Sequence, residues 1–161
     1  MDKERCQRAA EEYQDMVYRV ALHAAGHPQD AEDAVQEVFL RLYLEKKPFD
    51  SSEHLRRWLI RVTVNLCRDM LKSPWRRRRG TMPADLPAEP EFERAEQGEL
   101  YRAVLSLPEK YRTVLDLYYY EEVTAREIGE TLGLKTSAVT TRLSRGRELL
   151  KAKLTEGKGN G

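Results

Sequence analysis

The sequence lacks the features that mark a secreted, membrane-bound or metal-binding protein. Its 161 residues include only two cysteines, Cys6 and Cys67, which match no metal-ligand spacing, so we expect reduced thiols and no disulfide. No stretch approaches the roughly 20 consecutive apolar residues of a membrane span, and the N-terminal MDKERCQRAAEE is charged where a signal peptide is apolar. These absences predict a soluble, cytoplasmic protein without membrane insertion.

Catalytic signatures are missing as well. The three histidines, His23, His27 and His54, form no triad with a carboxylate or thiol at metal-binding spacing. The chain contains neither a phosphate-cradling glycine loop nor a nucleophile elbow. We therefore expect no enzymatic activity, no bound metal and no cofactor.

Charge of one sign is not in excess, because 28 basic and 27 acidic residues give a formal net charge of +1. The charges are nevertheless segregated along the chain. Every charge from Asp30 to Glu37 is negative, whereas from Arg56 to Arg79 a series of basic residues, ending in the run SPWRRRRG, is opposed by Asp69 alone. Separate faces of the protein are therefore expected to meet different partners.

Proline gathers between residues 80 and 96, where three of the seven prolines stand among scattered carboxylates with almost no apolar periodicity. This composition is typical of an extended, flexible linker. Elsewhere apolar residues recur at helical spacing and nothing alternates with period two for long, which predicts an all-α protein of two small helical domains. The expected division is a domain over residues 1–75, a linker over 76–95, a domain over 96–155 and a disordered tail over 156–161.

Apolar stripes and caps predict the helices of the first domain. Asp30 is the expected N-cap of the second helix, with Asp33 at its third position. The stripe of the first helix is Tyr13, Val17, Val20 and Ala21, and that of the second is Ala31, Ala34, Val35, Val38 and Leu42. A third helix is expected over residues 53–72, and four helices in the second domain over residues 95–106, 108–121, 124–132 and 136–154.

The third expected helix carries a basic stripe. At about 100° per residue, its polar side chains fall within an arc of roughly 80°, opposite the expected buried face. The stripe is Arg57, Arg61, Asn65, Arg68 and Lys72, and the buried face is Leu55, Leu59, Val62, Leu66 and Met70. Such a stripe neutralises phosphates well, and we see no interspersed i,i+4 carboxylate. Aromatic residues nearby, Phe49, Trp58 and Trp75, could stack on unpaired bases; the alternative is a merely solvated face.

A second candidate surface lies on the helix over residues 30–44. Five of its side chains line up away from the core stripe, namely Asp33, Gln36, Glu37, Leu40 and Leu44. An exposed leucine pair flanked by carboxylates suggests docking to a basic protein partner. Contact of Leu40 and Leu44 with another helix of the same domain is an equally good interpretation of the periodicity.

The most specific pattern is TAREIGETLGLKTSAVTTRLSRGREL, which predicts a helix-turn-helix. Thr124 and Glu127 form a capping box, Gly133 permits the tight turn, and Val139 and Leu143 belong to the core stripe of the second helix. Ser137, Thr140, Thr141, Ser144 and Arg145 then point outward, with Lys135, Arg142, Arg145 and Arg147 available for phosphates. The alternative is a helical hairpin used only for packing.

The order of these elements resembles a bacterial RNA polymerase sigma factor of the extracytoplasmic-function (ECF) group of the sigma-70 family. The resemblance spans about Ala10 to Leu154. The segment YQDMVYRVALHAAGHPQDAEDAVQEVFLRLY is similar to regions 2.1 and 2.2, FDSSEHLRRWLIRVTVNLCRDMLK to regions 2.3 and 2.4, and LSLPEKYRTVLDLYYYEEVTAREIGETLGLKTSAVTTRLSRGRELLKAKL to region 4.

The resemblance implies a role for each surface, and a partner for each. Core RNA polymerase would bind through its β′ clamp helices to Asp33, Gln36, Glu37 and Leu40, and its β flap would be a further contact. The minus-ten element would meet Phe49, Asp50, Ser51, Ser52 and Asn65 at a base pocket, with Arg57, Arg61, Arg68 and Lys72 on the backbone. The minus-thirty-five element would meet Lys135, Thr136, Ser137, Thr140, Thr141, Arg142, Ser144 and Arg145. The family also implies control by an anti-sigma factor.

Three departures from the family pattern limit what the resemblance implies. Ser137, Ala138 and Thr140 stand where the family often has a Gly-Thr pair and a basic residue, so the promoter preference is not transferred. Gly146 replaces an alanine, and the FDSSEH loop lacks the common glycine. A stand-alone helix-turn-helix transcriptional regulator, binding a palindrome as a dimer, is the alternative function.

Overall fold

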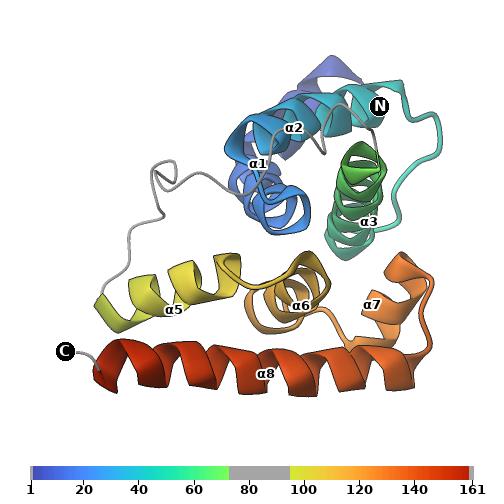
Figure 1. Cartoon of the computed structure of the whole chain (residues 1–161). Coiled ribbons are helices and arrows are strands. Elements are labelled where there is room, and N and C mark those ends of the chain that lie inside the picture. Colours follow the sequence, from blue (N-terminus) through green and yellow to red (C-terminus); the bar gives the residue numbers. More distant parts are fainter. Residues whose placement is uncertain (1, 73–94, 160–161) are drawn as a thin grey trace. The chain divides into compact units, whose positions relative to one another are not determined.

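A computed structural model of the chain describes residues 2–72 and 95–159, and these form helices joined by short connections (Figure 1). The elements are α1 (Lys3–Ala25), α2 (Pro28–Leu44), α3 (Ser52–Leu71), α5 (Ala95–Leu105), α6 (Glu109–Leu115), the π-helical turn η1 (Asp116–Tyr120), α7 (Ala125–Leu132) and α8 (Thr136–Gly159). No strand occurs in these two ranges, which confirms the all-α prediction.

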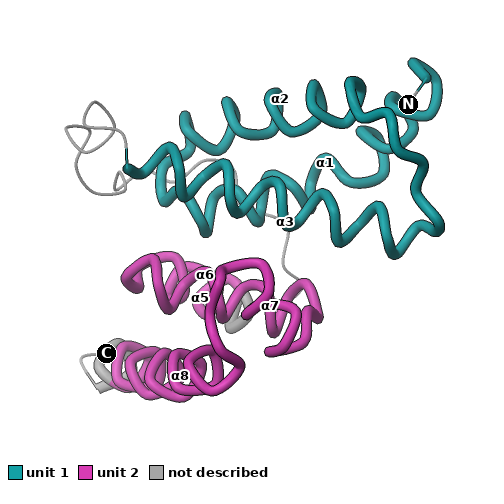
Figure 2. The backbone as a smooth tube through the Cα atoms, turned by 90° about the vertical axis from the view of Figure 1, so that its right-hand side faces the viewer, with its two compact units in different colours: residues 1–81 teal, residues 82–161 magenta. Residues whose placement is uncertain are grey.

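The chain divides into two compact units, residues 1–81 and 82–161 (Figure 2). Most of the expected linker lies outside the described residues, as do Trp75 and the arginines at 76–79. No helix of the described part is long and apolar enough to cross a membrane.

The turn between α1 and α2 is set by three consecutive residues. Gly26 adopts the left-handed conformation, with φ of 74°, and its N–H donates to the Leu22 carbonyl at 2.8 Å, which ends α1. His27 then caps α2 by accepting from the Gln29 N–H at 3.2 Å, and Pro28 fills the first helical position. The prediction that Asp30 caps this helix is therefore wrong, because the cap lies three residues earlier and Asp30 is buried within the first turn.

Small residues let the first three helices pack closely. Ala31, Ala34, Val38 and Leu42 on α2 are fully buried, as the apolar stripe predicts, while Val35 is only half-buried. Helix α2 contacts α1, on which Val17, Val20 and Ala21 are buried too. The core of the first unit therefore follows the predicted periodicity on α1 and α2.

The buried face of α3 differs from the predicted one by roughly 90° around the helix axis. Leu59 alone of the expected set is fully buried, whereas Leu55, Val62, Leu66 and Met70 are half-buried. The deepest side chains are Leu59, Ile60, Thr63, Val64 and Cys67. Since α3 contacts both α1 and α2, its buried arc is set by two neighbouring helices and not by one.

Cys67 is fully buried in the core of the first unit. Its Sγ lies 3.8 Å from the Ala21 carbonyl oxygen, and burial raises the pKa of the thiol to about 12. Cys6 is partly exposed on α1, and both cysteines are free thiols. The sulfur of Cys67 is therefore a small apolar group in the core.

The second unit differs from the prediction in two places. The expected helix over 108–121 is α6 followed by η1, where the Glu121 N–H donates to the Asp116 carbonyl five residues back at 3.1 Å. Helix α8 continues to Gly159 instead of ending at Leu154, so residues 156–159 of the expected tail are helical. Residues 136–159 contain no proline, and Gly146 lies within the helix without ending it.

Close packing accounts for Gly146 on α8. A Cβ built there would lie 3.1 Å from Leu115 Cδ1 and 3.4 Å from Tyr111 Cβ, tighter than most such contacts. Glycine lets α8 approach α6, and this close approach offsets the roughly 1 kcal/mol that glycine costs inside a helix.

We expect Gly133→Ala to lower the free energy of unfolding by about 1 kcal/mol. Gly133 has φ of +70° at the C-cap of α7, a conformation that a Cβ disfavours although no atom lies within 4 Å of the added carbon. Urea denaturation measures the loss. Gly133→Asn should lose less, because asparagine tolerates the left-handed region; an alanine variant as stable as the parent would contradict the assignment.

Candidate nucleic-acid interface

The polar side of α3 is exposed as predicted. Arg57, Arg61, Asn65 and Lys72 are exposed, and Arg68 is partly so. Within residues 2–72 and 95–159, the side chains of Arg61 and Lys72 make no ion pair. These two cations can therefore bind phosphates without breaking an ion pair to any residue in the described part of the chain.

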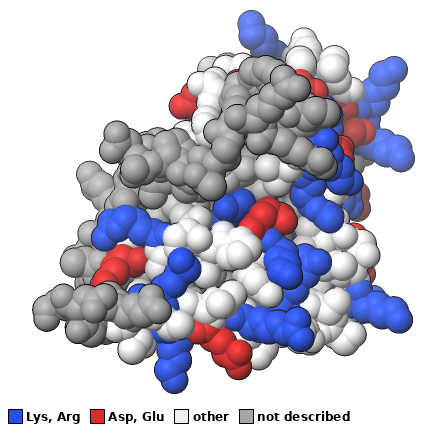
Figure 3. All heavy atoms as spheres, viewed as in Figure 1, with Lys and Arg blue, Asp and Glu red and all other residues white. Residues whose placement is uncertain are grey.

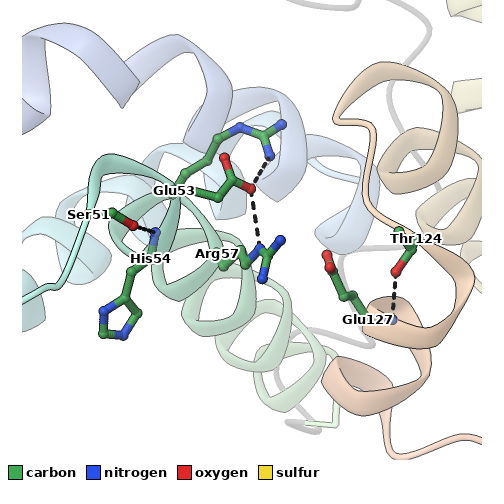
Figure 4. Close-up of polar contacts among 7 residues, drawn as sticks. Ser51, Glu53, His54, Arg57, Thr124 and Glu127 are labelled. Atoms are coloured by element: carbon green, nitrogen blue, oxygen red, sulfur yellow. Dashed lines mark hydrogen bonds and ion pairs between the residues drawn. The ribbon is translucent and has the colours of Figure 1, made fainter.

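The expectation that no carboxylate is interspersed along the stripe is wrong at its beginning. Glu53 lies one turn before Arg57, and its Oε1 is 3.2 Å from Arg57 Nε and 3.9 Å from Arg56 Nη1 (Figure 4). Glu53 thus partly neutralises the first cation of the stripe. Further along α3, Arg61 and Lys72 have no such carboxylate partner within the described residues 2–72 and 95–159.

The loop before α3 is held by its own backbone hydrogen bonds. The His54 N–H donates to Ser51 Oγ at 3.1 Å, which caps α3 (Figure 4), and the Asp50 N–H donates to His54 Nδ1 at 3.0 Å. The Phe49 ring packs edge-on against His54 and Trp58, with centroid separations of 5.2 and 5.5 Å. His54 therefore shapes this loop, a role that the histidine pattern alone did not indicate.

The polar face of α2 carries exposed apolar residues. Leu40 and Leu44 are 52% and 64% exposed, so the alternative that they contact another helix of the same domain is wrong. Tyr43, missed by the periodicity argument, is 49% exposed beside them. Gln36 is exposed, Asp33 and Glu37 are partly exposed, and Glu37 pairs with Arg41 at 3.1 Å. The face combines an apolar patch with carboxylates.

The helix-turn-helix prediction is confirmed by α7 and α8. Thr124 Oγ1 accepts the Glu127 N–H at 3.2 Å (Figure 4), and the Leu134 N–H donates to the Gly129 carbonyl at 2.8 Å. The inner side chains Ile128, Leu132, Val139 and Leu143 are buried. The predicted outer side chains Lys135, Thr136, Ser137, Thr140, Thr141, Ser144 and Arg145 are exposed, and Arg142 is partly exposed.

Two hydroxyls at the start of α8 have a defined orientation. Thr140 Oγ1 and Thr141 Oγ1 both donate to the Ser137 carbonyl at 2.9 Å. Because each hydroxyl hydrogen is used in this bond, the two hydroxyl oxygens can act toward a ligand only as hydrogen-bond acceptors.

On the face of the molecule seen in Figure 3, Lys and Arg side chains are more abundant than Asp and Glu side chains.

The sequence argument missed a tyrosine pair on η1. Tyr118 and Tyr119 are exposed, their rings meet edge-to-face at 5.0 Å, and Arg147 Nη1 donates to the Tyr119 hydroxyl at 2.6 Å. The next residue, Tyr120, is half-buried, and burial together with the Asp116 carboxylate raises its pKa. The π-helical turn therefore presents two of its three tyrosines outward.

Residues 9–77 match the family described as Sigma-70 region 2, and residues 97–150 match Sigma-70, region 4. The chain is 30% identical over 168 residues to the ECF RNA polymerase sigma factor SigW of Bacillus subtilis (strain 168), covering 89% of this chain and 86% of that protein. The chain belongs to the ECF group of RNA polymerase sigma factors. The region 2 match begins within α1 and extends past α3, and the region 4 match begins within α5 and ends within α8 at residue 150.

A second ECF relative is SigE of Mycolicibacterium smegmatis (strain ATCC 700084 / mc(2)155), 36% identical over 149 residues, or 87% of this chain and 58% of that protein. Two solved structures share the fold. The sigma factor RpoE in complex with the anti-sigma factor NepR from Bartonella quintana has a TM-score of 0.76 at 15% identity, covering 92% of this chain and 96% of that chain. CnrH in complex with the cytosolic domain of CnrY has a TM-score of 0.65 at 24% identity, covering 96% and 90%.

Proposed function

We propose that this ECF sigma factor binds core RNA polymerase, recognises the minus-thirty-five and minus-ten elements of promoters and initiates transcription, without catalysis of its own. One observation carries the proposal: both sigma-70 regions occur in one chain, in order, each within its own compact unit. A regulator that only binds DNA needs the second unit and leaves the first unexplained.

Region 2 offers the polymerase a face with apolar and acidic character. We assign Asp33, Gln36, Glu37 and Leu40 to the β′ clamp helices, because exposed Leu40 supplies area for desolvation and the carboxylates supply attraction for a basic partner. The proposed pairing predicts that salt weakens polymerase binding, since the carboxylates are accessible to solvent.

The minus-ten element is assigned to α3 and the loop before it. Phe49, Asp50, Ser51, Ser52 and Asn65 are placed at the captured base, and Arg57, Arg61, Arg68 and Lys72 along the strand backbone. The rings that support Phe49 give a stacking surface, and the exposed amide of Asn65 has both a donor and an acceptor for a base edge. Base capture therefore depends on the loop, whereas strand retention depends on the helix.

Region 4 is assigned to the minus-thirty-five element and to the β flap. The first turns of α8 would enter the major groove, with Thr136, Ser137, Thr140, Thr141, Ser144 and Arg145 toward bases and Lys135 and Arg142 toward phosphates. Because their hydroxyl hydrogens bond to Ser137, Thr140 and Thr141 would accept from exocyclic amino groups of adenine or cytosine.

Control by an anti-sigma factor forms the last part of the proposal. The solved RpoE structure contains the anti-sigma factor NepR, and RpoE shares the fold of this chain. An inhibitor that covers the exposed α2 face would compete with the polymerase for Leu40 and Leu44.

Transcription reconstituted from purified components tests the proposal. The chain added to core RNA polymerase should start transcription from a cognate promoter, while the chain alone should bind duplex DNA weakly. Tight binding to a palindrome by an isolated dimer, with no effect on core polymerase, would favour the stand-alone regulator instead.

A further inference from the structure

A hollow of about 390 Å³ opens between the first turns of α1 and the loop from α2 to α3. Figures 1 and 2 both show the N-terminal end of α1 beside this loop. Its wall runs from α1 through the loop to the first turn of α3, so Phe49, Ser51 and Ser52 share it with residues that the minus-ten assignment leaves out.

Four of the lining side chains are cationic, namely Arg5, Arg8, Lys46 and Lys47, whereas Glu12 is the one lining carboxylate. Arg5 lies 3.7 Å from Asp2, but both groups are largely exposed and water screens this pair. The side-chain cations of Arg8, Lys46 and Lys47 make no ion pair within the described residues 2–72 and 95–159. The hollow therefore concentrates positive charge that its own carboxylate does not balance.

The hollow is also lined by an aromatic ring, which narrows the class of ligand that fits it. The Phe49 ring is fixed by His54 and Trp58 and borders the hollow, and Ser51 and Ser52 add hydroxyl groups beside it. An aromatic ring and cations that line the same hollow match a nucleotide, whose base stacks and whose phosphate carries the negative charge. A purely acidic peptide would use the cations but would leave the aromatic side without a role.

We propose that this hollow binds a backbone phosphate of the unpaired promoter strand, next to the nucleotide at Phe49. Arg8 from α1 and Lys47 from the loop hold the phosphate, with Arg5 and Lys46 beside them. The inference rests on the proposed function and deepens it: the strand leaves the α3 stripe at the loop and continues onto α1. Since the contacts are to phosphate, they add affinity and direction without reading sequence.

The test uses holoenzyme assembled from the full chain and a forked DNA whose minus-ten strand is unpaired. Arg8→Ala combined with Lys47→Ala should weaken binding about tenfold and reduce the slope of log affinity against log salt by about 0.7, since the contact to one single-strand phosphate is lost. Both side chains are exposed, so the fold should survive. Binding to a duplex that contains only the minus-thirty-five element should not change.

The matched control is Lys110→Ala combined with Lys153→Ala, which removes the same charge from exposed positions of the second unit. The control should bind the forked DNA as tightly as the parent. Unchanged affinity and salt slope in the Arg8 and Lys47 variant, while Arg61→Ala with Asn65→Ala still loses binding, would overturn the phosphate site and leave the proposed function standing.

A free nucleotide is the other source of the same chemistry, so AMP is titrated into the parent chain. Millimolar or weaker binding of AMP is expected, because a single phosphate and base gain few contacts. Micromolar binding that the double variant abolishes, with forked-DNA affinity intact, would overturn the strand assignment in favour of a nucleotide-binding site. Failure of the parent holoenzyme to bind forked DNA at all would overturn both proposals.

Discussion

Replacing Arg61 and Asn65 by alanine should slow promoter opening about 100-fold while core polymerase binds as before. Both side chains are exposed on the outer face of α3, away from the core that α3 forms with α1 and α2. Loss of the hydrogen bonds made by one charged group and one amide costs about 3 kcal/mol of binding free energy. Since about 1.4 kcal/mol corresponds to a factor of ten, this loss corresponds to about 100-fold. Permanganate reactivity of unpaired thymines measures opening, and fluorescence anisotropy measures polymerase affinity.

Helix α1 offers a matched control. Lys3 and Gln7 stand one turn apart and are exposed, so Lys3→Ala with Gln7→Ala removes one charge and one amide at the same spacing. This variant should open promoters at the parental rate. If Arg61→Ala with Asn65→Ala instead lost polymerase affinity and kept its far-ultraviolet circular dichroism, the outer face of α3 would be a polymerase surface and the assignment would be wrong.

Changing Leu40 and Leu44 to aspartate should weaken binding to core polymerase about 100-fold or more, with transcription falling in proportion. The two side chains are 52% and 64% exposed, so aspartate costs little in the free chain. Burying two leucines in an interface contributes about 3 kcal/mol, and the variant both loses this and buries charge. Direct titration of labelled core polymerase with the chain measures the affinity.

The conservative variant Leu40→Met with Leu44→Met separates apolar contact from helix stability. Methionine keeps the apolar surface and the helix propensity of leucine, so polymerase affinity should stay within about threefold. If the aspartate variant bound core polymerase as tightly as the parent, the polymerase would not use the α2 face. Once the complex is assembled, promoter opening should be the same for the parent and for both variants.

Local signals in the sequence were enough to predict the helix-turn-helix. Thr124 supplies the cap and Gly133 supplies the turn, and both act within a few residues along the chain. The outward position of Thr140 and Thr141 follows from the buried Val139 and Leu143 on the same helix. These features depend only on the helical period and on the residues at the two ends of each helix, so the sequence is sufficient to predict them.

The predictions that were wrong concern residues whose position depends on more than one neighbouring group. The buried arc of α3 is centred on Thr63, Val64 and Cys67 because two helices pack against it, and a single apolar stripe describes contact with one. His27, not Asp30, caps α2 because Pro28 fixes where the helix begins. Glu53 was overlooked because it precedes the stripe, yet an i,i+4 pair reaches back one turn.

The helical period, the caps and the order of the motifs were sufficient to predict an all-α chain, a helix-turn-helix and the succession of sigma-70 regions. Three features became visible only in the folded chain: Leu40 and Leu44 face solvent, Gly146 of α8 packs against Leu115, and α1 and the loop at Lys47 line one hollow. Exposure and enclosure depend on which helices pack together, and residues far apart in sequence decide that packing.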